Sequence, residues 1–202
     1  SSFDLFNSSF IIIVVFHYAP QVNAGADVLL CKGSSIQLSA SGTGTFVWSP
    51  AAPLNNPNIY NPVASPDATT LFTVNLSDPW GCKNSDQVTV EVRVQPVANA
   101  GPDQNLDFTF ETNLQAIAPG TNQTGVWTLV EGEGDISDTH NPTTHVSDLS
   151  LETNSFLWTV TNGVCPASWD TVHIRVKNLI IPSLITPNLD GNNDFFVVRG
   201  IE

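Results

Sequence analysis

Methionine is absent from the 202 residues, and lysine and arginine are scarce. A chain without methionine contains no native start, so we expect a fragment or a processed product. Only six lysines and arginines stand against nineteen aspartates and glutamates, and the net charge is −13. Such a surface repels the phosphates of nucleic acids and anionic lipid head groups, so the composition argues against nucleic-acid and membrane-surface binding.

Long hydrophobic runs are also missing. The longest apolar run, residues 10–16, is far shorter than the roughly twenty residues of a transmembrane helix. It lacks the preceding basic region and the following small-residue cleavage site of a signal peptide. The run is typical of a strand buried on both faces. We therefore expect no transmembrane segment, and we expect residues 1–19 to be the end of a preceding β domain.

A repeated pattern organises the middle of the chain. Asn-Ala-Gly-Ala-Asp at residues 23–27 recurs as Asn-Ala-Gly-Pro-Asp at residues 99–103. Further matches follow in the same order: residues 46–48 with 125–127, residues 72–74 with 158–160, and Cys82 with Cys165. The order of these matches predicts two copies of one structural unit.

The end of each copy has the pattern of a half-buried β-strand. Valine occupies every second position from residue 88 to residue 94, and valine and isoleucine alternate with polar residues over residues 172–176. No window has helical periodicity, and glycine and proline interrupt the chain about every ten residues. Short strands at that spacing predict a β-sandwich, with Trp48 and Trp127 between its two sheets.

The two copies resemble the PKD-like and immunoglobulin-like repeats of bacterial surface proteins over residues 20–177. Trp-Ser-Pro at residues 48–50 and Trp-Thr-Leu at residues 127–129 stand where the standard PKD pattern has Trp-Asp-Phe-Gly-Asp-Gly, as in the variant repeats of gliding and gut bacteria. The resemblance implies an all-β fold of tandem sandwiches, with one repeat at residues 20–95 and the next at residues 96–177.

The end of the chain resembles the opening of the gliding motility-associated C-terminal domain. The motif is Thr-Pro-Asn-Leu-Asp-Gly-Asn-Asn-Asp at residues 186–194, followed by two phenylalanines. It predicts that residues 178–202 are a linker and the start of that domain. In this family the domain is the signal for the type IX secretion system of Bacteroidetes. The resemblance therefore implies an extracellular, cell-surface protein, with the secretion machinery and outer-membrane surface components as partners.

The chain has three cysteines: Cys31, Cys82 and Cys165. In the repeats that the chain resembles, cysteines placed like Cys31 and Cys82 form a disulfide, so the resemblance implies that bridge. Asp107 stands where the partner of Cys165 would be, and Cys165 is predicted to be free. No cysteine has histidine or cysteine neighbours at zinc-site spacing. A disulfide implies an oxidising, extracellular compartment.

One run of side chains could bind calcium, the single cofactor that the sequence suggests. Asn188, Asp190, Asn192 and Asp194 alternate around a glycine, and calcium takes six to eight oxygen ligands on loops of this kind. No bidentate glutamate follows at the expected distance. The alternative is an Asx-rich turn that hydrogen-bonds its own backbone.

Few other residues suggest chemistry. Trp80, between Pro79 and Gly81, is the aromatic residue best suited to contact a polysaccharide, and a loop anchor packed near the disulfide is the alternative. His140 and His145 are close enough in sequence to share a metal ion, although solvated loop histidines are commoner. The chain contains no Gly-x-Ser-x-Gly elbow and no phosphate-binding loop, so no catalytic residue is predicted.

These patterns together predict the structural repeat region of a large secreted adhesin, used in gliding motility or attachment, and not an enzyme. Stacked repeats would hold a distal binding region away from the cell. Two alternatives stay open: a polysaccharide-binding module that uses Trp80, and an accessory module of a secreted hydrolase.

Overall fold

A computed structural model describes residues 17–177, which contain β-strands and no helix. Within them the chain divides into two compact units. The first consists of residues 17–28 and Gly33–Glu91, and the second of Leu29–Lys32 and residues 92–177. The predicted all-β class is confirmed. The repeat limits predicted from sequence stay a prediction, because these units are defined by packing and not by independent folding.

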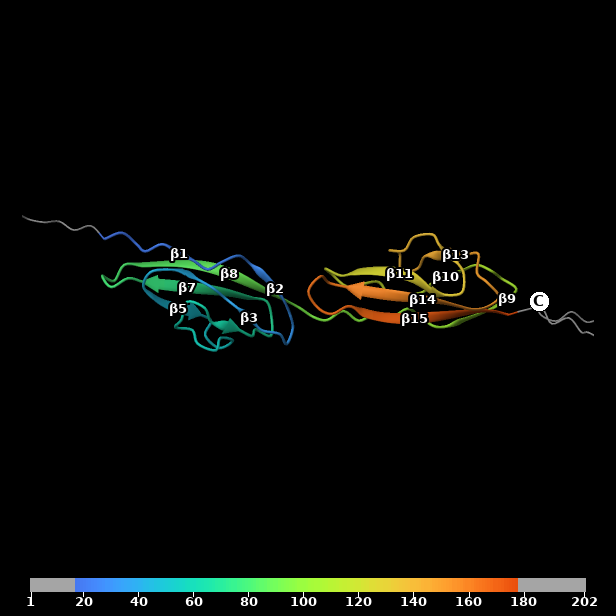
Figure 1. The fold of residues 1–202 in the computed structure, drawn as a ribbon, viewed down its shortest axis with the longest axis horizontal. Coiled ribbons are helices and arrows are strands. Elements are labelled where there is room, and N and C mark those ends of the chain that lie inside the picture. Colours follow the sequence, from blue (N-terminus) through green and yellow to red (C-terminus); the bar gives the residue numbers. More distant parts are fainter. Residues whose placement is uncertain (1–16, 178–202) are drawn as a thin grey trace, which may run out of the picture. The chain divides into compact units, whose positions relative to one another are not determined.

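A four-stranded sheet in the order β2-β8-β7-β5 contains the main strands of the first unit (Figure 1), although packing assigns Leu29–Cys31 of β2 and the last two residues of β8 to the second unit. These strands are β2 (Val28–Cys31), β8 (Lys83–Arg93), β7 (Thr70–Ser77) and β5 (Thr45–Ser49). Two short pairs complete the unit: β1 (Val22–Asn23) with β4 (Ser41–Gly42), and β3 (Ile36–Gln37) with β6 (Val63–Ala64). The predicted alternation is present at Val88 and Val90, which are buried with the more exposed Thr89 between them. It was wrong at Val94, which follows the end of β8 and is 66% exposed.

The second unit has a four-stranded sheet in the order β11-β14-β15-β9 (Figure 1). These strands are β11 (Thr124–Glu131), β14 (Glu152–Thr161), β15 (Ser168–Lys177) and β9 (Gln104–Asp107). A smaller sheet contains β10 (Thr112–Asn113), β13 (His145–Ser147) and β12 (Asp135–Ile136). The apolar side chains of both sheets form one core, in which Leu114, Val146 and Ile174 are fully buried.

The two large sheets have the same strand order, because β2, β8, β7 and β5 correspond to β9, β15, β14 and β11. The cross-strand registers refine the alignment. Trp48 lies opposite Val74, and Trp127 lies opposite Trp158, so Val74 and Trp158 are equivalent. The predicted match of residues 72–74 with 158–160 was therefore wrong by two residues. A shift of two leaves every side chain on the same face of a strand, so alternation alone could not detect it.

The repeated Asn-Ala-Gly-x-Asp segment makes the same three hydrogen bonds in both units. In the first unit the N–H groups of Gly25, Ala24 and Thr89 donate to Asn23 Oδ1, Asp86 Oδ2 and Asp27 Oδ1 at 2.8, 2.8 and 2.7 Å. In the second unit the N–H groups of Gly101, Ala100 and His173 donate to Asn99 Oδ1, Asp170 Oδ2 and Asp103 Oδ1 at 2.9, 2.8 and 2.8 Å. Asp86 on β8 and Asp170 on β15 therefore occupy equivalent positions in the two units.

The glycine of this segment is required by the backbone. Gly25 and Gly101 have φ angles of 89° and 86°, a left-handed conformation that glycine adopts without the steric cost of a Cβ atom. A Cβ atom at Gly101 would also overlap the carbonyl oxygen of Gln115. The segment recurs in the sequence because each of its positions has a backbone role at the entry to the sheet.

Candidate functional site

Cys31 forms a disulfide with Cys165, and Cys82 is a free thiol. The Cα atoms of Cys31 and Cys165 are 5.0 Å apart, within the normal range for a cystine. The Cys31–Cys82 bridge that the resemblance implied was therefore wrong, and so was the prediction that Cys165 is free.

The direction of β2 explains this correction. The Thr89 N–H donates to Asp27 before β2, and the Lys32 N–H after β2 donates to the Arg93 carbonyl at 2.8 Å, so β2 runs in the same direction as β8. Cys31 consequently lies near the last residue of β8, whereas Cys82 precedes its first residue. The eleven residues of β8 separate these two ends by about 33 Å, at about 3.3 Å per step between residues, which no disulfide can span.

The turn between β14 and β15 brings Cys165 to its partner. Asn162 Oδ1 accepts hydrogen bonds from the N–H groups of Val164 and Cys165 at 3.2 and 2.8 Å. Asn162 Nδ2 donates to the Val94 carbonyl at 2.9 Å, and Arg93 Nη1 donates to the Asn162 carbonyl at 2.8 Å. These contacts hold the turn against the end of β8. Leu29–Lys32, which contains Cys31, belongs to the same compact unit as this turn.

The turn between β7 and β8 contains the predicted glycan-contact residue, Trp80. Its indole is 68% exposed and stacks on the His17 ring, with centroids 4.6 Å apart and an interplanar angle of 25°. The alternative role as an anchor near a Cys31–Cys82 bridge is excluded, because that bridge does not exist. Contact with a polysaccharide stays a prediction.

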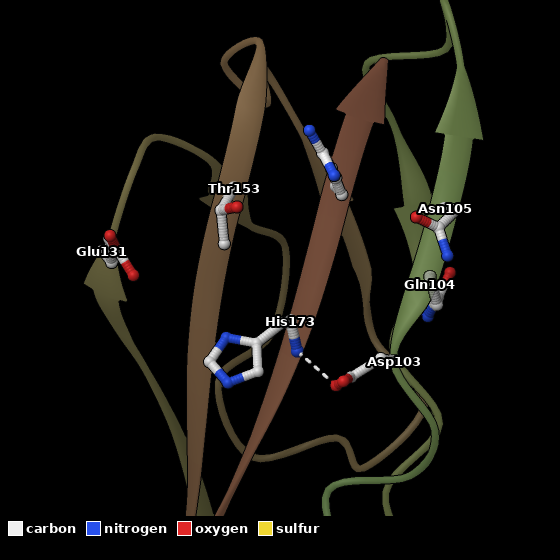
Figure 2. Close-up of a pocket in the computed structure, with 7 residues that line it drawn as sticks. Asp103, Gln104, Asn105, Glu131, Thr153 and His173 are labelled. Carbon is white, nitrogen blue, oxygen red and sulfur yellow. Dashed lines mark hydrogen bonds between the residues drawn. The ribbon is translucent and has the colours of Figure 1, made fainter.

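An open depression of about 420 Å³ lies on the outer face of the second unit's large sheet. Its walls come from β9, β11, β14 and β15, and Figure 2 shows the N–H of His173, in the middle of β15, donating to Asp103, which directly precedes β9. The lining residues are polar or charged: Asp103, Gln104, Asn105, Glu131, Thr153, His173 and Arg175. The depression is a shallow polar surface, and the sequence reasoning had not identified it.

Beside this depression, Ser155, His173 and Glu131 form a hydrogen-bonded cluster without catalytic geometry. Ser155 Oγ lies 2.8 Å from His173 Nδ1 and donates to Glu131 Oε2 at 3.1 Å. In a serine hydrolase the histidine stands between the serine and the acid, whereas here the serine is the central group. Ser155 is also only 2% exposed, so a substrate could not reach its oxygen. The cluster links β11, β14 and β15.

The predicted metal sites divide into those that the structure describes and those that it does not. His145 contacts Glu111 at 3.6 Å and Asn113 at 3.3 Å. The His140 ring lies 3.2 Å from Thr139 Oγ1, and the His140 N–H donates to Asp138 Oδ1 at 2.9 Å. Within residues 17–177, no three histidine, cysteine or acidic side chains are grouped as metal ligands. The candidate calcium ligands Asn188, Asp190, Asn192 and Asp194 lie outside the described residues, and calcium binding stays a prediction.

Comparison with known proteins identifies the fold and not the family. No family model matches the chain, and no curated protein matches it. A titin I-band fragment, I67–I69, is similar with a TM-score of 0.53 at 14% identity, over 81% of this chain and 68% of that one. Immunoglobulin domains 1–5 of Sidekick-1 also give a TM-score of 0.53 at 14% identity, over 82% of this chain and 40% of that one.

A mutated variant of the titin fragment gives a TM-score of 0.51, and the chain spans 66% of its length. These neighbours confirm an immunoglobulin-like β-sandwich fold. The disulfide indicates a secreted or extracellular protein, because such bonds persist in oxidising compartments. Among residues 17–177 there is no helix with the length and apolar character that crossing a membrane requires.

Proposed function

We propose that the chain is a structural repeat region of a large secreted cell-surface adhesin, in which tandem sandwiches space a binding region from the cell. The observation that carries this proposal is the repetition itself: both units have the same strand order and the same three Asn-Ala-Gly-x-Asp hydrogen bonds. An array of like domains lengthens a protein without adding a new active site.

The route of export in this proposal is the type IX secretion system, with the outer-membrane machinery as partner. Its support is the sequence resemblance of residues 186–196 to the gliding motility-associated C-terminal domain. The cystine adds support for an oxidising destination, because such bonds persist outside the cytosol. Use in gliding or in attachment belongs to the same proposal.

Surface labelling of the source bacterium tests this function. An antibody raised against residues 17–177 should label intact cells, and protease added outside the cells should remove the signal. A mutant that lacks type IX secretion should lose surface labelling while the protein accumulates inside. Labelling only after lysis of wild-type cells would contradict the proposal.

A second candidate, polysaccharide binding, is favoured by one observation: the large exposed face of Trp80. Aromatic rings at this exposure can stack on sugars, as they do at many binding surfaces. A glycan array probed with the chain and with Trp80→Ala separates the two functions. A pure spacer binds no glycan, whereas a binding module gives signals that the substitution removes.

A further inference from the structure

Two turns at equivalent places in the units each carry a cysteine held in the same way. Asp78 Oδ1 accepts the N–H of Cys82 at 2.8 Å, and Asn162 Oδ1 accepts the N–H of Cys165 at 2.8 Å. Asp78 follows the last residue of β7, and Asn162 follows the last residue of β14. The free thiol and the bonded one therefore occupy the same structural position.

Each of these sulfur atoms also faces the same backbone position of the repeat. Cys165 Sγ lies 3.4 Å from the Arg93 carbonyl, and Cys82 Sγ lies 3.9 Å from the His17 carbonyl. Arg93 precedes Asn99 by the same number of residues as His17 precedes Asn23, and a proline follows at the same spacing in both segments. The chain that enters the first unit thus corresponds to the chain that enters the second.

The two turns differ in that Cys165 has a disulfide partner and Cys82 does not. Cys165 is bonded to Cys31, the last residue of β2, whose neighbour Lys32 donates to the Arg93 carbonyl. The sequence has three cysteines, and this disulfide uses two of them. A disulfide of Cys82 would therefore need a cysteine outside these 202 residues. Trp80, two residues before Cys82, is 68% exposed and stacks on the His17 ring.

We propose that Cys82 forms a disulfide with the cysteine that ends a β2-like strand in a further copy of this repeat, upstream of the first unit. The inference rests on the proposed array, and it makes each repeat covalently bonded to the next. The two thiols lose two electrons and two protons to a small-molecule disulfide such as oxidised glutathione, which leaves as two thiols. The Cys31–Cys165 bond needs an oxidant of the same class.

An extended chain tests this linkage. A copy of residues 20–92, carrying Cys82→Ser, is placed directly before residues 17–202, so that His17 follows Val92 as Arg93 does in the chain itself. After refolding with oxidised and reduced glutathione, non-reducing peptide mapping should find Cys82 bonded to Cys31 of the added copy. Alkylation of Cys82 should fall at least about tenfold, and the original Cys31–Cys165 bond should persist.

Two variants control the experiment. Cys31→Ser in the added copy should return Cys82 to full alkylation, and Asp78→Asn, which copies Asn162, should leave the new bond intact. Cys82 that stays free, bonds to glutathione or joins a second molecule, while Cys31–Cys165 forms, would overturn the inference. Failure of both bonds would overturn it too, because the first unit would then not accept a preceding copy.

The outcome is independent of the surface-labelling experiment. If Cys82 bonds to the added copy but intact cells are not labelled, the linkage stands and the adhesin proposal fails. If cells are labelled but Cys82 stays free, the repeat region is exported without this covalent connection.

Discussion

The two units have the same strand order but fill their cores differently. In the first, Trp48 Nε1 donates to the Ile59 carbonyl at 3.0 Å. In the second, Trp127 packs on Trp158 with ring centroids 4.9 Å apart, and among the described residues no group accepts from either buried indole N–H. One unit satisfies its central tryptophan by a hydrogen bond, and the other gains aromatic packing at the expense of that bond.

The second unit makes room for its extra indole by a compensating small residue. Trp158 replaces Val74 of the first unit, and Gly125 lies two residues before Trp127, where the first unit has Phe46. A Cβ atom at Gly125 would overlap Cζ2 and Cη2 of Trp158. Side-chain volume has moved from one strand to its neighbour, so a shared fold does not require a shared core.

Removal of the cystine should have the largest effect. Cys165→Ser opens a loop of 134 residues, for which the chain-entropy model gives a loss of about 5 kcal/mol in the free energy of unfolding. Urea denaturation of the oxidised proteins measures this loss. The matched control Cys82→Ser should change the free energy by less than about 0.5 kcal/mol. Equal effects of both substitutions would contradict the assigned pairing.

The substitution Gly125→Ala should destabilise the second unit and leave the packing of the first unit unchanged. Gly125→Ala forces the added Cβ atom against the Trp158 ring, and overpacking of this kind costs about 2–3 kcal/mol. Gly120→Ala is the matched control, since its Cβ atom would make only ordinary contacts with Gln123. The pair of substitutions is compared by urea denaturation, and a midpoint unchanged by Gly125→Ala would show that Trp158 can move aside.

Calcium should stabilise the chain by a smaller amount if the predicted ligands bind it. At a free calcium concentration ten times Kd, mass action adds about 1.4 kcal/mol to the stability of the domain that binds it. The chain is titrated with calcium while the thermal midpoint is followed. Asp190→Ala and Asp194→Ala should abolish the rise, and a rise that survives both would place the ion elsewhere.

Acid should weaken the first unit through Asp86. Hydrogen bonds from the Ala24 and Gln87 N–H groups hold the pKa of this carboxyl below its ordinary value of 3.8. A folded-state pKa below the unfolded one means that the stabilisation is present above pH 3.8 and is lost as pH falls through the folded pKa. Asp86→Asn should therefore flatten the fall in thermal midpoint below pH 4, measured against the exposed control Asp67→Asn. Identical acid profiles would contradict this role.

The sequence predicted the features that depend on local pattern. Alternation identified Val88 and Val90 as inward-facing, although it wrongly included Val94, which is 66% exposed. The repeated Asn-Ala-Gly-x-Asp segment identified two copies, because these signals need only a few neighbouring residues. Trp48 and Trp127 were correctly placed in the interior, where both are almost completely buried.

The sequence could not predict features that depend on strand direction and register. The pairing of Cys31 requires knowing that β2 runs parallel to β8 and ends far from Cys82. The contact of Ser155 with His173 arises because these residues lie opposite each other on β14 and β15, eighteen positions apart in sequence. No local signal marks either relationship, since both depend on how distant strands align.

Non-reducing peptide mapping of the oxidised, alkylated chain most directly tests the claim that Cys31 is bonded to Cys165 and that Cys82 is free. The structure predicts one peptide pair that joins Cys31 to Cys165, together with a fully alkylated Cys82. A peptide pair that joins Cys31 to Cys82, with Cys165 alkylated, would contradict it.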